Sequence, residues 1–312
     1  MTAHIKWISD NLGILSKRRI NHIVLPASHD TGAYLINWNI NPSLGTTIYQ
    51  KIYNAAQHSK FIKNVIEKWT LTQEYTVYNQ LLLGIRNLDL RLACIDDIFY
   101  LAHTYICDKF ETVLGDIVRF LQEHPKEILF LRFRSDYENR ATMTKERNDQ
   151  VLDKVHALLG SYLIPRTTDN SFPTLGNVLS GSGRIILYYR GNCTRRDYVW
   201  SRHYVHGGWT TTTKVSTKLT FLANELKKMK RTNRNLNELG FTLTPGTWNI
   251  VSGVILPCIA PNGLHYLAQE IQATLPVFIN DNQTESPKIS AITTDFPTVE
   301  FISNVININK RN

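Results

Sequence analysis

The stretch Ile23-Val24-Leu25-Pro26-Ala27-Ser28-His29-Asp30-Thr31-Gly32 decides the fold class of this chain. An apolar run bounded by proline and glycine is typical of a buried strand, and we expect one over residues 20–25 that stops at Pro26. The turn after it carries the pair His29-Asp30, at the place where α/β folds hold their reactive side chains. A helix N-cap formed by the serine or the aspartate is the alternative that this stretch alone leaves open.

Strand and helix patterns alternate along the rest of the chain. Leu88, Leu90 and Leu92, for example, alternate with charged residues as one face of a strand does. We expect strands over residues 20–25, 85–93, 98–102, 128–133, 184–189, 241–243, 248–255 and 288–293. We expect helices over residues 4–13, 48–69, 74–83, 111–124, 147–159, 217–230 and 262–275. This alternation predicts a mostly parallel sheet with crossover helices, either open or closed into a barrel.

Length and composition define a broad class of protein. The chain has 312 residues, of which 43% are hydrophobic and 20% charged, as in an ordinary soluble globular protein with a substantial core. This length is within the range of one α/β barrel, and no composition break marks a linker, so we expect a single domain over residues 1–312. The four cysteines contain no C-x-x-C pair, which argues against a zinc site and suits a reducing compartment.

Charge and the N-terminal sequence bear on partners and location. The net charge of +9 indicates an anionic partner: nucleic acid, anionic lipid headgroups or a phosphorylated substrate. The first ten residues lack the apolar core of a signal peptide, and no run of about 18 apolar residues could span a membrane. We therefore expect a cytoplasmic protein, with export by a route without a cleaved signal left open. Tyr34, Ile36, Trp38, Ile40 and Tyr49 either pack on the core or contact a membrane surface.

Polar residues follow the carboxyl ends of the predicted strands at several places. In a parallel barrel these ends share one rim, so residues far apart in sequence meet there. The set combines two histidines, two carboxylates and several arginines: His29, Asp30, Arg91, His103, Arg132, Arg134, Arg190 and Asp295. Their joint position at the predicted strand ends favours a catalytic role over isolated structural roles.

This set of side chains suits acid–base cleavage of a phosphodiester. One neutral imidazole can act as the base and one imidazolium as the acid near neutral pH, each held in orientation by a carboxylate. Arginine matches phosphate oxygens and carries a permanent positive charge. Attack by an internal hydroxyl needs these three functions together. A metal-dependent hydrolase is the rival hypothesis, but it would need more carboxylates than Asp30, Asp89 and Asp295.

On these motifs the chain resembles the X-type catalytic domain of phosphatidylinositol-specific phospholipases C, above all its small single-domain, bacterial-type and X-domain-only members. The matching motifs are residues 25–32, 80–91, His103, 120–133, 184–190, Gly208-Trp209 and Asp295-Phe296. The resemblance covers nearly the whole chain and is specific over the first 135 residues. It implies a distorted, incompletely closed TIM-like (β/α) barrel. It also implies cleavage of phosphatidylinositol, or a related inositol phospholipid, to diacylglycerol and inositol 1,2-cyclic phosphate.

The resemblance implies a role for each catalytic residue. His29 would take the proton from the inositol 2-hydroxyl, and Asp295 would orient it. His103 would protonate the diacylglycerol oxygen with support from Asp30. Arg91 would stabilise the charge on the phosphate, at the place where metal-dependent relatives hold calcium, so we expect no metal and no other cofactor.

The resemblance also implies contacts with the inositol ring. Arg190 would contact the ring hydroxyls, as would either Arg132 or Arg134, between which the alignment does not choose. Trp209 is the nearest candidate for an aromatic wall of the pocket. Thr104 follows the acid histidine where the family usually has glycine, so a different turn is expected there.

The implied partner is a membrane surface that contains phosphatidylinositol, bound peripherally. We expect no nucleic acid partner, and a monomer is the default oligomeric state. Two other functions stay open at this point. One is a catalytically silent inositol-lipid-binding module on the same fold, and the other is a metal-dependent glycerophosphodiester phosphodiesterase.

Overall fold

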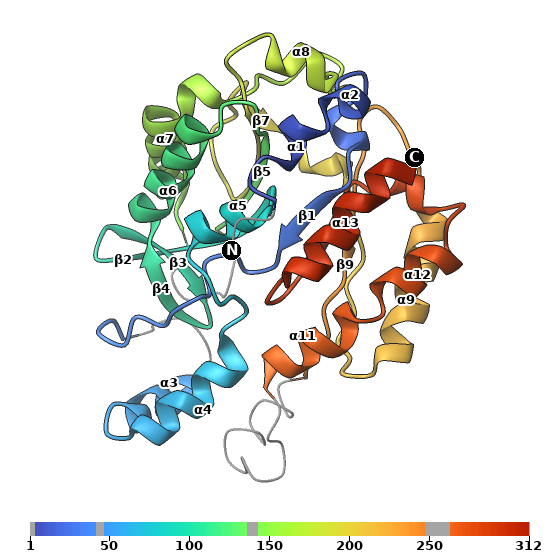
Figure 1. The fold of residues 1–312 in the computed structure, drawn as a ribbon. Helices are drawn as coiled ribbons and strands as arrows, with labels where there is room; N and C mark the ends of the chain where they lie inside the picture. Colours follow the sequence, from blue (N-terminus) through green and yellow to red (C-terminus); the bar gives the residue numbers. More distant parts are fainter. Residues whose placement is uncertain (1–3, 42–46, 136–142, 247–262, 312) are drawn as a thin grey trace.

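The computed structural model of the chain describes residues 4–41, 47–135, 143–246 and 263–311. In these ranges strands and helices alternate, and the helices pack around the outside of a curled sheet (Figure 1). None of the described helices has the length and the apolar composition that crossing a membrane requires.

In the described part of the chain, the curled sheet contains eight parallel strands. β1 (Leu25–Ser28) is central and pairs with β2 (Asn87–Ile95) on one side and β10 (Ala291–Thr294) on the other. From edge to edge the order is β7 (Val199–Trp200), β6 (Ile185–Arg190), β5 (Leu129–Arg134), β2, β1, β10, β9 (Leu236–Gly240) and β8 (Val205–His206). Within the described residues β7 and β8 are not paired, so the barrel is incompletely closed, which confirms the predicted fold class.

Amphipathic helices cover the outer face of the sheet. In α6 (Phe110–Glu123), the side chains Val113, Ile117 and Leu121 recur at helical spacing and are fully buried. The other α-helices of the described ranges are α1 (Trp7–Asp10), α2 (Leu12–Leu15), α3 (Thr47–Ala56), α4 (Lys60–Thr70), α5 (Val77–Leu83), α7 (Lys145–Leu159), α8 (Leu175–Leu179), α9 (Val215–Lys228), α11 (Leu264–Gln272), α12 (Leu275–Asp281) and α13 (Val299–Arg311).

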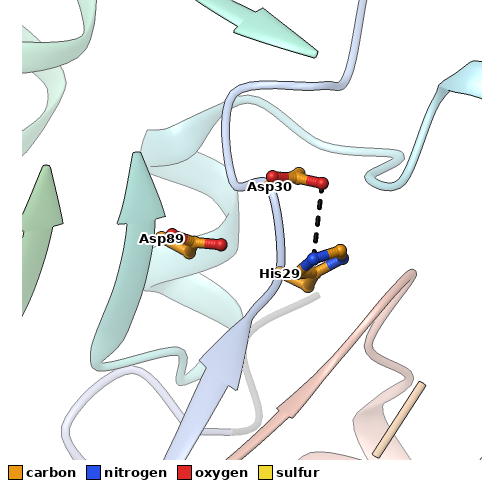
Figure 2. A group of neighbouring side chains, drawn as sticks. All are labelled: His29, Asp30 and Asp89. Atoms are coloured by element: carbon orange, nitrogen blue, oxygen red, sulfur yellow. Dashed lines mark ion pairs between the residues drawn. The ribbon is translucent and has the colours of Figure 1, made fainter. Parts of the chain in front are cut away.

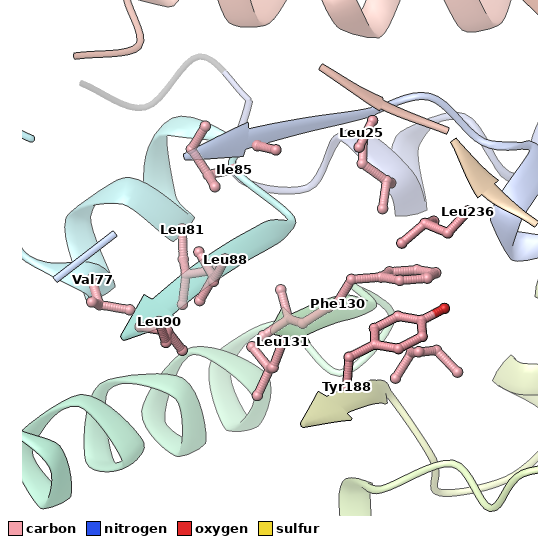
Figure 3. Packing of buried hydrophobic residues seen from close by; sticks show 14 of the residues in the cluster. Leu25, Val77, Leu81, Ile85, Leu88, Leu90, Phe130, Leu131, Tyr188 and Leu236 are labelled. Carbon is pink, nitrogen blue, oxygen red and sulfur yellow. The ribbon is translucent and has the colours of Figure 1, made fainter. Parts of the chain in front are cut away.

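The period-two alternation of the strands decides which side chains reach the barrel interior. On β2, Leu88 and Leu90 point to α5 and pack with Val77 and Leu81 (Figure 3). Asp89 lies between the two leucines and therefore points to the opposite face, where it lines a cavity. The strict alternation in the sequence thus separates the outer core from the interior of the barrel.

The interior positions form layers whose chemistry changes along the strands. In parallel register, side chains on neighbouring strands lie level with one another, as in other barrels. From the amino end towards the carboxyl rim, the aligned sets on β2, β5 and β6 are Asn87, Phe130 and Ile186; then Asp89, Arg132 and Tyr188; then Arg91, Arg134 and Arg190. The set at the amino end, which holds two apolar residues and one amide, therefore gives way to three arginines at the rim.

The first strand lies later in the chain than predicted. Residues Ile20–His22 form a 3-10 turn, and β1 starts at Leu25, so Pro26 lies inside the strand and does not end it. Proline is tolerated there because β2, on that side of β1, starts only at Asn87. The Pro26 carbonyl still accepts a hydrogen bond from the backbone N–H of Arg86.

The third predicted strand exists but does not belong to the parallel barrel. β3 (Ile98–His103) pairs antiparallel with β2 and with β4 (Tyr105–Lys109). Asp96 and Asp97 both have positive φ, 48° and 60°, which matches a two-residue hairpin turn between β2 and β3. Because β2 runs past the rim before the chain folds back, β3 brings His103 down to the rim from above. The expectation that this strand end shares the rim through parallel packing is therefore wrong, although His103 does reach the rim.

Two further strand predictions fall near residue 240. β9 lies at Leu236–Gly240, before the predicted strand 241–243. The sequence did not indicate a strand there because Asn237 and Glu238 interrupt the apolar pattern. Both side chains are nonetheless buried and hydrogen-bonded inside the protein. The predicted strand 248–255 lies outside the described residues.

The residues considered for membrane contact between positions 34 and 49 mostly pack inward. Ile36 is buried, and Trp38 stacks on Tyr53 with ring centroids 5.6 Å apart. The Tyr34 hydroxyl donates a hydrogen bond to Asp108, which fixes it on the protein. For these side chains the core-packing alternative holds.

Candidate active site

A cavity of about 690 Å³ opens at the carboxyl rim of the barrel. The residues that line it come from the turn after β1, from strands β2, β3, β5, β6, β8, β9 and β10, and from loops that include the one after β8. They include His29, Asp30, Arg91, His103, Arg132, Arg134, Arg190 and Trp209, all predicted from the sequence. Asp295, the remaining predicted residue, lies behind His29 and contacts its ring.

Asp30 connects the two histidines. One of its carboxylate oxygens, Oδ2, lies 3.4 Å from Nε2 of His29 and 3.2 Å from Nε2 of His103. Its other oxygen contacts Nε of Arg91. Figure 2 shows the carboxylate of Asp30 facing the His29 ring just past the end of β1. The residue is 2% exposed and has a φ of 44°, a left-handed conformation that costs energy and is typical of constrained functional turns.

His29 is held in the orientation and tautomer that a base needs. Its Nδ1 lies 2.8 Å from Oδ1 of Asp295, and its Nε2 lies 2.9 Å from Nη2 of Arg91. A guanidinium can only donate, so Nε2 of the neutral ring accepts and Nδ1–H donates to Asp295. Burial alone would lower the pKa of His29, but the carboxylates Asp30 and Asp295 outweigh burial and Arg91 and raise this pKa above 6.5.

His103 has a different set of partners. Its Nδ1 lies 2.8 Å from the backbone carbonyl of Thr70, which can only accept, so Nδ1 carries a proton. Its Nε2 faces the carboxylate of Asp30. Donation to that carboxylate requires a second proton, which only the imidazolium ring has. The two rings are thus arranged differently: His29 as an acceptor at Nε2 and His103 as a donor.

Arg91 occupies the centre of the charged group. Among the described residues, His29, Asp30 and Asp89 have potential ligand atoms within 4.8 Å of one another, a spacing that could hold a metal ion. The Arg91 guanidinium contacts all three of these side chains. Burial would raise the pKa of Asp89, but Arg91 and Arg132 outweigh it and hold that pKa well below its ordinary value. This donor set fits an arginine and does not fit a divalent metal, since the guanidinium already takes the cation's place.

Glu238 is a cavity residue that the sequence analysis missed. Its carboxylate contacts Arg132 and accepts a hydrogen bond from Nδ2 of Asn87, while Arg132 also lies 3.5 Å from Asp89. Two acids therefore balance the charge of Arg132. Arg134 lies one layer nearer the rim, and both arginines line the cavity. Had a strand ending at Gly240 been predicted, Glu238 would have been placed on the same face as Gly240, because alternate residues of a strand share one face.

Trp209 forms one wall of the cavity beside His29. The indole and imidazole rings stack with centroids 4.8 Å apart and an angle of 27°. The indole approaches β9 closely, since a Cβ atom on Gly240 would lie 2.9 Å from it. Trp209 is 45% exposed, so its outer surface stays accessible at the mouth of the cavity.

Curated proteins of one family are similar to this chain in sequence. PI-PLC X domain-containing protein 2 of mouse is 25% identical over 313 residues, which covers 97% of this chain and 87% of that protein. PI-PLC X domain-containing protein 3 of mouse is 24% identical over 302 residues and covers 93% of this chain and 88% of that protein. These matches over nearly the whole chain support the PI-PLC X-domain family.

The other comparisons concern a shorter sequence match, family models and solved structures. A PI-PLC X-box domain-containing protein of Dictyostelium discoideum is 31% identical over 158 residues, but the match spans 51% of this chain and only 20% of that protein. No family model matches the chain. Among solved structures, the phosphatidylinositol-specific phospholipase C from Listeria monocytogenes has a TM-score of 0.68 at 18% identity, covering 97% of this chain and 98% of that one. This likeness concerns the fold.

One departure from the family pattern lies in the turn after His103. Thr104 stands where a glycine is usual after the second histidine, and the sequence predicts a different turn. In the structure Thr104 has a φ of 62°, the left-handed conformation that glycine favours. The turn thus has a backbone conformation that is uncommon for a β-branched residue.

Proposed function

We propose that this chain cleaves phosphatidylinositol, or a related inositol phospholipid, by general acid–base catalysis without a metal ion. The observation that carries the proposal is the arrangement around Asp30, whose buried carboxylate lies between His29 and His103 while Arg91 contacts it from a third side. Base, acid and cation thus converge on one cavity, as cleavage of a phosphodiester by a neighbouring hydroxyl requires.

The proposed reaction assigns one proton transfer to each histidine. Nε2 of His29 takes the proton of the inositol 2-hydroxyl as its oxygen bonds to phosphorus. The bond between phosphorus and the diacylglycerol oxygen breaks, and Nε2 of His103 gives that oxygen its proton. Arg91 stabilises the negative charge that develops on the phosphate oxygens. The products are diacylglycerol and inositol 1,2-cyclic phosphate, and the two histidines end with their protonation states exchanged.

Phosphorus NMR of the products tests this reaction directly. With vesicles that contain phosphatidylinositol and an excess of EDTA, we expect a cyclic phosphodiester signal to appear, because Arg91 supplies the cation. A reaction that stops on chelation and returns with calcium would support a metal-dependent phosphodiesterase instead. Vesicle binding without any product would support the silent lipid-binding alternative.

The pH dependence of the reaction tests the assignment of the base. The base must be neutral and the pKa of His29 is raised, so kcat/KM should increase with pH through a midpoint above 6.5. Asp295→Asn removes one carboxylate that raises this pKa, so the midpoint should move to lower pH while kcat falls. The exposed Asp281 offers the control Asp281→Asn, which should leave the midpoint unchanged. An Asp295→Asn midpoint that stays in place or moves up would contradict the assignment.

We also propose that the chain binds its lipid substrate as a peripheral protein at a membrane surface. The net charge of +9 favours an anionic surface. Phe61 on α4 is 65% exposed and lies between Lys60 and Lys63 in sequence, a combination that suits the membrane interface. One similar solved structure concerns modulation of the membrane binding of Staphylococcus aureus phosphatidylinositol-specific phospholipase C. A cytoplasmic monomer remains our expectation for this chain.

A further inference from the structure

A fully buried lysine lies behind the wall of the cavity. Lys218 is on α9, which packs against β9 on the outside of the barrel (Figure 1). Its side chain is 0% exposed, and among the described residues Nζ has no hydrogen-bond partner. Burying an ammonium group without such a partner is unfavourable, so a residue that served only to fill space would be better apolar.

The contacts of Lys218 lead to the proposed base. Its Nζ lies 4.7 Å from the centroid of the Trp209 ring and 5.8 Å from that of Phe221, both within the range of cation–π interactions. The same indole stacks on the imidazole of His29. Gly208 lets this loop lie close to α9, because a Cβ atom there would be 2.8 Å from Phe221. Lys218 and His29 therefore contact the same indole ring.

Electrostatics connects the same residues by a second route. Asp295 is the charged group that attracts the Lys218 ammonium, and it also bonds to Nδ1 of His29. Burial lowers the pKa of Lys218 to about 8, with Asp295 opposing this change, so the amine stays mainly charged at neutral pH. The charged groups that act on His29 itself are Asp30, Asp295 and Arg91. Lys218 and His29 thus share Asp295 as a charged neighbour.

We propose that Lys218 is a positioning residue for His29. Its ammonium group holds the Trp209 indole against the imidazole and weakens the attraction of Asp295 for the proton on that ring. This inference rests on the proposed function only in taking His29 as the base. Without the Lys218 charge, Asp295 should attract the proton on His29 more strongly, so that His29 binds this proton more tightly.

An NMR titration of the histidine rings tests the inference without relying on activity. In Lys218→Met, which keeps the length of the side chain and removes its charge, the pKa of His29 should rise by about half a pH unit or more. The His29 signal is assigned by its loss in His29→Asn. The matched control is Lys228→Met, on the same helix but with a 73% exposed side chain, which should not move the titration. Lys218→Arg, which keeps the charge, should stay close to the wild type.

Two further measurements separate this role from packing and from failure of the proposed function. In an Asp295→Asn background, Lys218→Met should change the His29 titration much less, since the shared carboxylate is gone. In an active enzyme, the acid limb of kcat/KM in Lys218→Met should move to higher pH with the NMR midpoint. An unmoved His29 titration in Lys218→Met, or in Lys218→Gln if the methionine variant does not fold, overturns the inference. An inactive wild-type protein with a shifted titration overturns the proposed function and leaves this inference standing.

Discussion

His29→Ala and His103→Ala should each lower the release of cyclic product from phosphatidylinositol by at least about 10³-fold, because each removes one partner of a concerted proton transfer. The two variants should respond differently to the leaving group. A substrate with a nitrophenol-type leaving group needs no proton on the departing oxygen, so it should recover much of the activity of His103→Ala. It should not recover the activity of His29→Ala, because the attacking hydroxyl still lacks its base.

The control for this pair is His156→Ala, an exposed histidine on α7 that should retain wild-type turnover. Circular dichroism and thermal unfolding should show that the site variants stay folded, since both rings lie at the rim and are partly exposed. Near-native turnover of either site variant would exclude the acid–base assignment. Recovery of His29→Ala alone by the activated substrate would instead exchange the two roles.

The second large effect concerns stability and lies at the other end of the barrel. Arg86 and Glu127 form a fully buried ion pair, with Arg86 Nη2 2.8 Å from Glu127 Oε2. Arg86 also donates to the backbone carbonyls of Leu81 and Ile85, and Glu127 accepts from the N–H and the hydroxyl of Ser9. The pair therefore ties the N-terminal helices, the end of α5 and the starts of β2 and β5 together.

Glu127→Gln should destabilise the protein by about 3–5 kcal/mol, because it leaves the Arg86 guanidinium buried without a countercharge. Denaturant unfolding measured by circular dichroism gives the free energy of unfolding. The double variant Arg86→Met with Glu127→Leu should recover part of the loss, since it removes both charges together. Glu123→Gln breaks an exposed ion pair with Arg119 and is the control, for which we expect little change. A Glu127→Gln protein as stable as this control would show that the pair is not a structural link.

Much of the site could be predicted because strand ends are a local property of the sequence. An apolar run that ends in a charged residue is visible without any tertiary information, and parallel packing then brings such ends to one rim. This reasoning correctly placed His29, Arg91, Arg134 and Arg190 around one cavity. It placed His103 there as well, but through an antiparallel hairpin that the Asp96-Asp97 turn could have indicated.

The residues that were missed are those whose burial contradicts their chemistry. Glu238 lies in a strand that was not predicted, because polar residues interrupt its apolar pattern. Lys218 belongs to a helix rich in lysine, a composition that is typical of a solvent-exposed surface. Tyr188 was inside a predicted strand, two residues before Arg190, so the period-two alternation would have placed it in the barrel interior. For Glu238 and Lys218, the exposure of the polar side chain depends on what packs against it, which sequence pattern alone does not contain.

The sequence by itself determined the alternation of strands and helices and the position of each charged side chain relative to its strand end, because both follow from periodicity over a few residues. The tertiary structure decided the pairing within the cavity: Asp295 with His29, Asp30 with both histidines, and the Trp209 indole with Lys218. Those pairings depend on strand register, on a hairpin that folds back and on a loop 180 residues from His29 in sequence. The stretch around His29 therefore predicts the fold class, while the partners of His29 are fixed only when the barrel forms.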